Sequence, residues 1–305
     1  MKPLICAIVV ALSVWAAPTL SLAQDNACPE TADRLPMDEL DALVEGPMEL
    51  VREGQLEAGQ RSFEALLATR AGGSGGKLAV ADSLIAFGVN LHSEGTTDPE
   101  FQRNALPYLR RAIDAYIEIF GPDHPEVALA WATLGDAAYT IDPKAPSDET
   151  VDALQRAYDI RKKTLQSPNV ETAANLDALG RVTGAPGRSN GDPARIAMAE
   201  KLFIDALAET ERLGCETGLA RTIQRNHLQM LLANGRDEAA DSQFRRWAAQ
   251  ASEDHLVGLV GDYLETLKEN DRADEAARIR AEFAGPAERS NDILFILFGI
   301  LDPTT

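Results

Sequence analysis

The sequence predicts an all-α fold, an α-solenoid of about five to six antiparallel helix hairpins. Three observations favour this fold. Apolar residues recur at helical spacing through most of the chain, a short motif ending in glycine returns at a nearly constant interval, and helix-ending residues separate the expected helices. Repetition at this interval is typical of proteins that stack similar units against one another.

The N-terminus has the layout of a secretory signal peptide. Lys2 precedes an apolar run over residues 4–17, and Ser21 and Ala23 provide the small residues that a signal peptidase requires. We therefore predict cleavage after Ala23 and a periplasmic or secreted protein.

Four segments are expected along the chain. They are a signal peptide over 1–23, a flexible lead over 24–36, a helical repeat domain over 37–284 and a C-terminal tail over 285–305. The tail contains an apolar run over 293–301, far shorter than the roughly 20 residues that cross a bilayer, so no membrane span is expected in the mature chain. We expect the tail to cap the array; docking on a second copy, which would make a homo-oligomer, is the alternative.

Charge and cysteine content limit the function. The formal net charge is -19, and the longest basic cluster is residues 161–163, which argues against binding to nucleic acid. Once Cys6 leaves with the signal peptide, Cys28 and Cys215 remain. An oxidising compartment would permit a disulfide between them, and the sequence leaves this open.

A five-residue motif of two large apolar residues and a glycine occurs at residues 84–88, 131–135 and 176–180. Two helices can cross closely where one of them lacks a side chain. We therefore expect Gly88, Gly135 and Gly180 to lie at helix crossings. The apolar members, expected in the core, are Leu84, Phe87, Trp131, Leu134, Leu176 and Leu179.

A second motif pairs a turn with the start of a helix. Residues 237–240 follow Asn234-Gly235, and residues 274–277 follow Asn270-Asp271, with the same Asp-Glu-Ala-Ala sequence in both copies. The turn ends one helix, the acidic residues favour the start of the next, and the alanines give it a thin face. A turn at Gly54 fits the same plan.

The segment over 120–128 has the sequence Phe-Gly-Pro-Asp-His-Pro-Glu-Val-Ala. Together with the motifs described above, this segment resembles tetratricopeptide repeats (TPRs) of the kinesin-light-chain type. In that family a Gly-Pro-Asp-His-Pro element links one repeat to the next. The resemblance covers about residues 40–283 and departs at the ends, where Gly59 replaces an expected alanine and Leu228 a hairpin glycine. It implies a right-handed superhelix of hairpins.

The linker can also be interpreted from its residues. Gly121 is expected to end the helix over 105–120 in a left-handed conformation, Pro122 to block its continuation and Asp123 to cap the next helix, which starts at Pro125. Such a short reversal makes successive helices antiparallel. We expect eleven to twelve helices between residues 37 and 283.

Motifs that suggest chemistry have simpler interpretations. Gly72-x-Ser74-x-Gly76 matches the letters of a nucleophile elbow, but that elbow follows a strand, so residues 71–77 are interpreted as a flexible link. No two of the histidines lie within four residues on one expected helix, which argues against a zinc site. These are His92, His124, His227 and His255; His124 is expected to stabilise the linker turn. We predict no catalytic residues, metal or cofactor.

The family resemblance implies a concave groove, lined by the first helix of each hairpin, that holds a peptide. Stepping from each hairpin glycine gives the candidates Asp82, His92, Asp136, Tyr139, Asp177, Arg181, Arg225 and Gln229. Acidic groups precede arginines along this row, which would orient a partner of asymmetric charge. The alternative is that each residue is a solvated position on an amphipathic helix.

The sequence thus favours an exported, non-enzymatic TPR-type scaffold that binds a protein or peptide partner, in envelope assembly or secretion. Two alternatives stay open. One is a self-assembling structural protein that uses the apolar tail. The other is a hydrolytic enzyme whose site is the loop over 184–193, rich in Gly, Pro, Ser and Asn, with nearby carboxylates.

Overall fold

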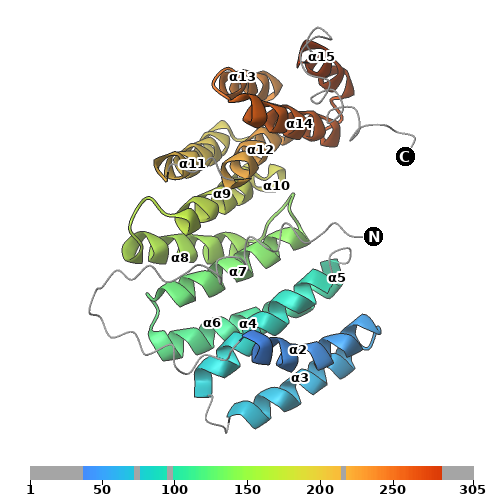
Figure 1. Ribbon diagram of the computed structural model, residues 1–305, viewed down its shortest axis with the longest axis vertical. Helices are drawn as coiled ribbons and strands as arrows, with labels where there is room; N and C mark the ends of the chain where they lie inside the picture. Colours follow the sequence, from blue (N-terminus) through green and yellow to red (C-terminus); the bar gives the residue numbers. More distant parts are fainter. Residues whose placement is uncertain (1–36, 72–75, 95–98, 214–217, 284–305) are drawn as a thin grey trace. The chain divides into compact units, whose positions relative to one another are not determined.

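The computed structural model describes residues 37–71, 76–94, 99–213 and 218–283, and their regular structure is helical (Figure 1). Several predictions concern residues outside these ranges. They are the signal peptide and its cleavage site, the lead, Cys28 and Cys215, Ser74, and the C-terminal tail.

Twelve long helices in the described ranges form six hairpins, as the repeat pattern predicts. The first helices are α2 (Met37–Arg52), α4 (Gly76–Glu94), α7 (Pro125–Ile141), α9 (Val170–Gly184), α12 (Gly218–Ala233) and α14 (Glu253–Glu269). Their second helices are α3 (Leu56–Ala71), α6 (Leu106–Phe120), α8 (Asp148–Thr164), α11 (Pro193–Arg212), α13 (Asp237–Ala248) and α15 (Ala273–Phe283). Short helices α5 (Pro99–Gln102), η3 (Arg103–Ala105) and α10 (Pro186–Ser189) lie within connections. Each hairpin packs on the next along the chain.

The three motif glycines lie where the two helices of a hairpin touch. A Cβ atom on Gly88 would stand 2.7 Å from Leu109 Cδ2, and one on Gly135 would stand 2.6 Å from Leu154 Cγ. One on Gly180 would stand 2.9 Å from Phe203 Cζ. The predicted close crossings in the second, third and fourth hairpins are therefore confirmed.

The first hairpin reverses this arrangement. A Cβ on Gly59, in the second helix α3, would stand 2.6 Å from the Pro47 carbonyl oxygen of α2. The missing side chain therefore lies on the second helix of this hairpin, which explains why glycine replaces the expected alanine there.

The link between α6 and α7 corrects two predictions, the left-handed conformation of Gly121 and the cap at Asp123. Gly121 has φ 85° and ψ 162°, beyond the left-handed helical region but still accessible to glycine. His124, and not Asp123, caps α7, because the chain is extended at His124, immediately before Pro125. Its Nδ1 accepts a hydrogen bond from the Glu126 N–H at 3.2 Å. Asp123 instead forms an ion pair with Lys163 at 3.1 Å.

Three turns share one hydrogen-bonding pattern. The N–H of Gly54 donates to the Val51 carbonyl, and the next N–H donates to the Leu50 carbonyl. The same pair of bonds occurs around Gly235 and Asp271, and all three turn residues have positive φ. This is the Schellman arrangement that ends a helix and satisfies its last carbonyls.

The apolar core divides into three clusters along the array. One joins the first three hairpins, from Val44 to Ile160, and another joins the last three, from Leu176 to Ile279. Between them Leu154, Ala178, Leu179 and Val182 form a small cluster. Five of the six motif residues predicted in the core are buried. Trp131 is only partly buried, and the centre of its ring lies 5.0 Å from the Arg156 guanidinium carbon.

Candidate partner-binding surface

Polar contacts join each first helix to the next one along the chain. At the N-terminal end Arg52 Nε of α2 donates to Glu94 Oε1 of α4 at 2.8 Å. His92 Nε2 of α4 lies 2.6 Å from Thr140 Oγ1 of α7. The first three hairpins are therefore linked through hydrogen bonds on their first helices.

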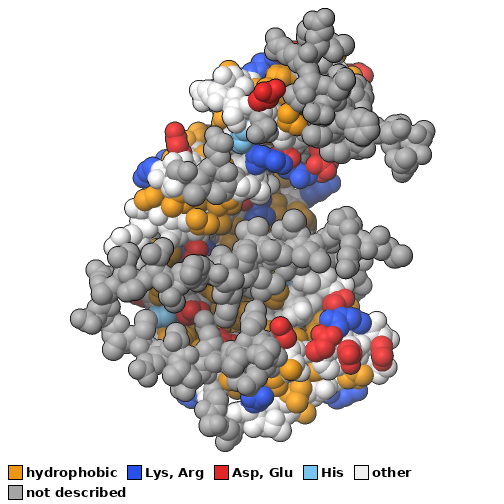
Figure 2. All heavy atoms as spheres, in the orientation of Figure 1, with side chains coloured by type: hydrophobic (Ala, Val, Ile, Leu, Met, Phe, Trp, Pro, Cys, Tyr) orange, Lys and Arg blue, Asp and Glu red, His pale blue; other side chains and the backbone are white. Residues whose placement is uncertain are grey.

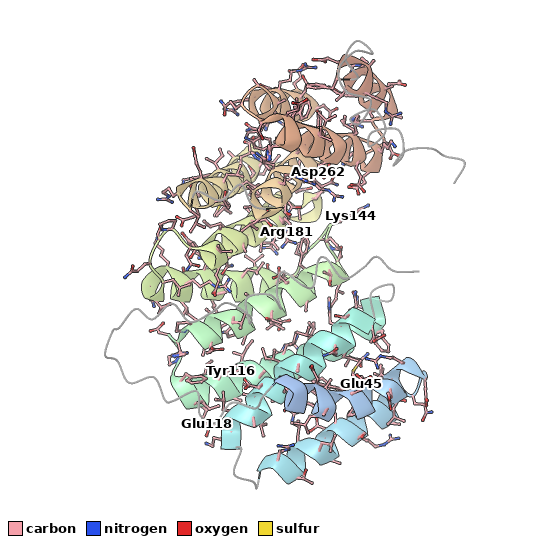
Figure 3. All side chains as sticks on the ribbon, viewed as in Figure 1. Glu45, Tyr116, Glu118, Lys144, Arg181 and Asp262 are labelled. Atoms are coloured by element: carbon pink, nitrogen blue, oxygen red, sulfur yellow. The ribbon has the colours of Figure 1, made fainter. Side chains whose placement is uncertain are left out.

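The middle of the array contains the densest group. Arg181 of α9, labelled in Figure 3, donates from Nη2 to Asp136 Oδ1 of α7 and from Nε to Asp177 Oδ2, both at 3.2 Å. Its guanidinium carbon stands 4.6 Å from the centre of the Tyr139 ring. Asn226 Nδ2 of α12 donates to both Asp177 oxygens, at 3.0 and 2.9 Å. These five side chains connect α7, α9 and α12.

Three contacts connect α12 to α14. Arg225 Nη2 donates to Glu269 Oε1 at 3.2 Å, and Asn270 Nδ2 donates to Gln229 Oε1 at 2.9 Å. Arg221 Nε donates to Asp262 Oδ2 at 3.0 Å. Gly258 leaves room for this arginine, because a Cβ there would stand 2.7 Å from Arg221 Nη1.

We call the side chains that make these contacts the first-helix row. Six of the predicted candidates belong to it through direct hydrogen bonds: His92, Asp136, Asp177, Arg181, Arg225 and Gln229. Tyr139 belongs through its ring contact. The remaining candidate, Asp82, does not. Its carboxylate is buried, with 2% of the residue exposed, and accepts from the Tyr116 hydroxyl of α6 at 2.5 Å.

Sequence reasoning missed several members of the row. They are Arg52, Glu94, Thr140, Arg221, Asn226, Asp262, Glu269 and Asn270. The bonded partners lie 41 to 49 residues apart, close to the spacing of the hairpin glycines. A search for complementary polar residues one repeat apart would have found them.

Burial changes the role of Asp177. Only 5% of this residue is exposed, and its oxygens already accept bonds from Asn226 and Arg181. Burial raises the pKa of its carboxyl, and the nearby Arg181 charge only partly opposes this effect. Asp177 and Asp82 are therefore internal acceptors that position helices, and neither offers much surface to a partner.

The predicted change from acidic to basic along the row is not present. Arg181 lies between two carboxylates, and Arg225 pairs with both Glu265 and Glu269. The row and its paired side chains contain four arginines against seven carboxylates. They are Arg52, Arg181, Arg221 and Arg225, with Glu45, Glu94, Asp136, Asp177, Asp262, Glu265 and Glu269. Each arginine is thus neutralised internally, and the surface keeps an acidic excess.

Exposed carboxylates of the first-helix row and its paired side chains lie near both ends of the helical array and in its middle. The side chains of Glu45, Asp136 and Glu265 are 58%, 56% and 59% exposed. Acidic side chains gather around a basic one over the α2–α3 hairpin (Figure 2). A partner would therefore meet carboxylates whose charge the arginines only partly cancel.

The loop between α9 and α11 joins three hairpins. The predicted loop over 184–193 contains the helical turn α10, and the Gly187 N–H donates to the carbonyl of Lys144, labelled in Figure 3, at 2.7 Å. Arg188 Nη1 donates to Asp148 Oδ1 at 2.9 Å, and Ser189 Oγ donates to Asn234 Oδ1 at 2.5 Å. These polar groups hold neighbouring connections together.

In the described part of the chain, no group of three or more His, Cys, Asp or Glu residues is arranged to hold a metal ion. Within the same ranges no helix has the length and apolarity needed to cross a membrane.

Comparison with known proteins supports the fold. No family model matches the sequence, and no curated protein matches it either. Two solved structures described as Podosopora anserina putative kinesin light chain nearly identical TPR-like repeats are similar, each at 18% identity. One covers 69% of this chain and 93% of its own length with a TM-score of 0.51; the other covers 70% and 98% with 0.50.

The described chain has the TPR-like repeat fold. The likeness confirms the predicted α-solenoid of helix hairpins and the resemblance to kinesin-light-chain repeats, and the six hairpins described above agree with the expected five to six. Identity this low concerns the arrangement of the backbone alone, so the use of the TPR-like fold in this chain has to be argued from its own side chains.

Proposed function

We propose that this TPR-like chain is a scaffold that binds a segment of a partner protein along the first-helix row. The observation that carries the proposal is the continuity of the row: hydrogen bonds connect the first helices from α2 to α14, so polar side chains of six hairpins face one connected surface. Repeat arrays use such extended surfaces to bind other proteins.

The charge of the row indicates the chemistry of the partner. Because its arginines are neutralised internally while carboxylates such as Asp136 and Glu265 stay exposed, we expect a segment that contains Lys or Arg. The same surface would repel acidic segments. The formal net charge of -19 acts in the same direction, since it raises the rate of encounter with basic partners.

The first test is site-specific photocrosslinking in cells that make the full chain. A photoreactive residue is placed at Asp136 or at Glu265, and as a matched control at Asp152, an exposed aspartate on α8. We expect one protein to be captured at both row positions and not at the control. Capture of nothing, or equal capture at the control, would contradict the proposal; capture of a second copy would indicate self-assembly.

A charge-reversal measurement tests the partner chemistry. The double variant Asp136→Lys with Glu265→Lys should weaken binding of the captured partner by at least tenfold, because it converts two attractive contacts to repulsive ones. Raising the salt concentration should weaken the wild-type complex as well. Asp152→Lys serves as the control and should leave the affinity within about twofold. An unchanged affinity in the double variant would contradict a basic partner.

Export and a role in envelope assembly or secretion also belong to the proposal. The supporting observation is the signal-peptide layout before Gln24. Intact mass of the protein purified from its native compartment should correspond to a chain that begins at Gln24. A mass that retains residues 1–23 would contradict cleavage at this site.

A further inference from the structure

His227 is a buried histidine between the fourth and fifth hairpins. It belongs to α12, and 2% of the residue is exposed. Its ring stacks on Phe203 of α11, with centroids 5.2 Å apart and planes at 12°. It also makes a T-shaped contact with the ring of Trp247 from α13, with centroids 5.7 Å apart and planes at 67°. In the described structure neither ring nitrogen has a hydrogen-bond partner.

This environment suits the neutral imidazole and opposes its protonated form. An imidazolium has two N–H donors and a full charge, and both would be removed from water without an acceptor. Burial lowers the pKa of His227 to about 4, and the positive charge of Arg246 on α13 acts in the same direction.

The carboxylates of the helices around α12 are engaged elsewhere. Asp177 of α9 accepts bonds from Asn226 and Arg181, while Glu265 and Glu269 of α14 pair with Arg225. On α11 the buried Glu209 accepts from Ser167 and the Asn169 N–H and pairs with Arg212. On α13 Asp237 pairs with Arg272, and Asp241 pairs with Arg245. None of these carboxylates is bonded to the His227 ring, so none offsets a charge there.

The position of His227 connects its protonation to the first-helix row. The two residues before it, Arg225 and Asn226, link α12 to α14 and to α9. A movement of α12 that relieves a buried imidazolium would therefore also disturb the row near its middle.

We propose that His227 makes the contact between the fourth and fifth hairpins sensitive to pH. When the imidazole takes one proton from solvent, with no other covalent bond made or broken, α12 loosens from α11 and α13 and the hydrogen bonds of the first-helix row are interrupted there. This inference does not depend on a partner and adds a regulatory property to the proposed scaffold.

The direction of the effect follows from linkage. Because the pKa of His227 is lower in the folded state than the ordinary 6.5, the opened state binds more protons, and opening becomes easier as the pH falls from about 6.5 to about 4. The full effect is about a 300-fold increase in the opening equilibrium constant, and about 30-fold is expected at pH 5.

Hydrogen exchange of the full chain, followed by mass spectrometry at pH 7 and pH 5 and corrected for intrinsic rates, measures this opening. In the wild type, protection of α11–α13 should fall about 30-fold relative to α2 and α3. In His227→Phe, which keeps an aromatic ring at this site, the pH-dependent loss should disappear. In the control His255→Phe, which replaces a partly buried histidine of α14, it should remain. An equal loss in wild type and His227→Phe would overturn the proposal.

A direct titration keeps the test decisive if His227→Phe fails to fold. The NMR signal of the His227 ring in the wild type should titrate with a midpoint below 5, together with the loss of protection in α12. A midpoint near 6.5 with unchanged protection of α12 would overturn the proposal.

Discussion

Close contact between helices depends on single glycines in this chain. At Gly135 an added Cβ would stand 2.6 Å from Leu154 Cγ and 3.3 Å from its backbone N, and Leu154 is buried. The neighbouring backbone leaves little room for relaxation there. By contrast, a Cβ on Gly261 of α14 would meet nothing within 4 Å.

Gly135→Ala should therefore lower the free energy of unfolding by about 1–2 kcal/mol, because overpacking outweighs the better helix propensity of alanine. Urea denaturation of the variant and the wild type measures the difference. Gly261→Ala is the matched control and should raise stability by up to about 1 kcal/mol. Equal effects of the two substitutions would show that helix propensity alone determines the change in the free energy of unfolding and that the crossing at Gly135 tolerates a methyl group.

At the scale of elements, the three Schellman turns carry the same bonds on different residues. The positive φ position is Gly54 in the first hairpin, Gly235 in the fifth and Asp271 in the sixth, where φ is 59°. An aspartate residue adopts this backbone conformation at an energetic cost that glycine does not have. The last turn is therefore under more strain than its two counterparts.

Replacing the strained residue should stabilise the last hairpin. We expect Asp271→Gly to raise the free energy of unfolding by about 0.5–1 kcal/mol and the reverse change Gly235→Asp to lower it by a similar amount. Thermal unfolding of both variants provides the measurement. A decrease on Asp271→Gly would mean that the Asp271 side chain contributes more than its backbone strain costs.

At the scale of the whole molecule, two large apolar clusters meet through a small one. Trp131 lies against the cluster of the first three hairpins and Trp247 against that of the last three. Leu179, which is 3% exposed, belongs to the cluster between them. In repeat proteins such an interface determines whether neighbouring units unfold together.

Leu179→Ala should therefore separate the unfolding of the two halves. Truncation of a buried leucine costs about 2–5 kcal/mol, and here the loss falls on the contact between the clusters. Denaturant unfolding of a chain that begins at Gln24, and therefore lacks Trp15, is followed by fluorescence in the Trp131→Phe and Trp247→Phe backgrounds, each of which leaves one tryptophan as reporter. The two transitions should coincide with Leu179 present and separate after its replacement. Ile279→Ala, at the buried face of the last helix, should leave them coincident.

Most of the helical plan could be predicted from the sequence because its signals are local. Gly121 and Pro125 delimit one connection through the conformations available to their own backbones. Gly88, Gly135 and Gly180 mark helix crossings because a missing Cβ is visible in the sequence itself. The cap of α7 was assigned one residue too early, since the position of an N-cap depends on where the extended backbone ends.

The sequence by itself determined that the chain forms helical hairpins and gave their number to within one, because hydrophobic spacing and turn chemistry act within a few residues. Only the tertiary structure decided which polar side chains meet across repeats. It buried Asp82 and Asp177, paired Arg181 and Arg225 with carboxylates of neighbouring hairpins and placed His227 against two aromatic rings. These properties depend on contacts between different helices, from 20 residues apart in sequence for His227 and Trp247 to 49 for Asp177 and Asn226, so they are set by the packing of the helices within and between hairpins.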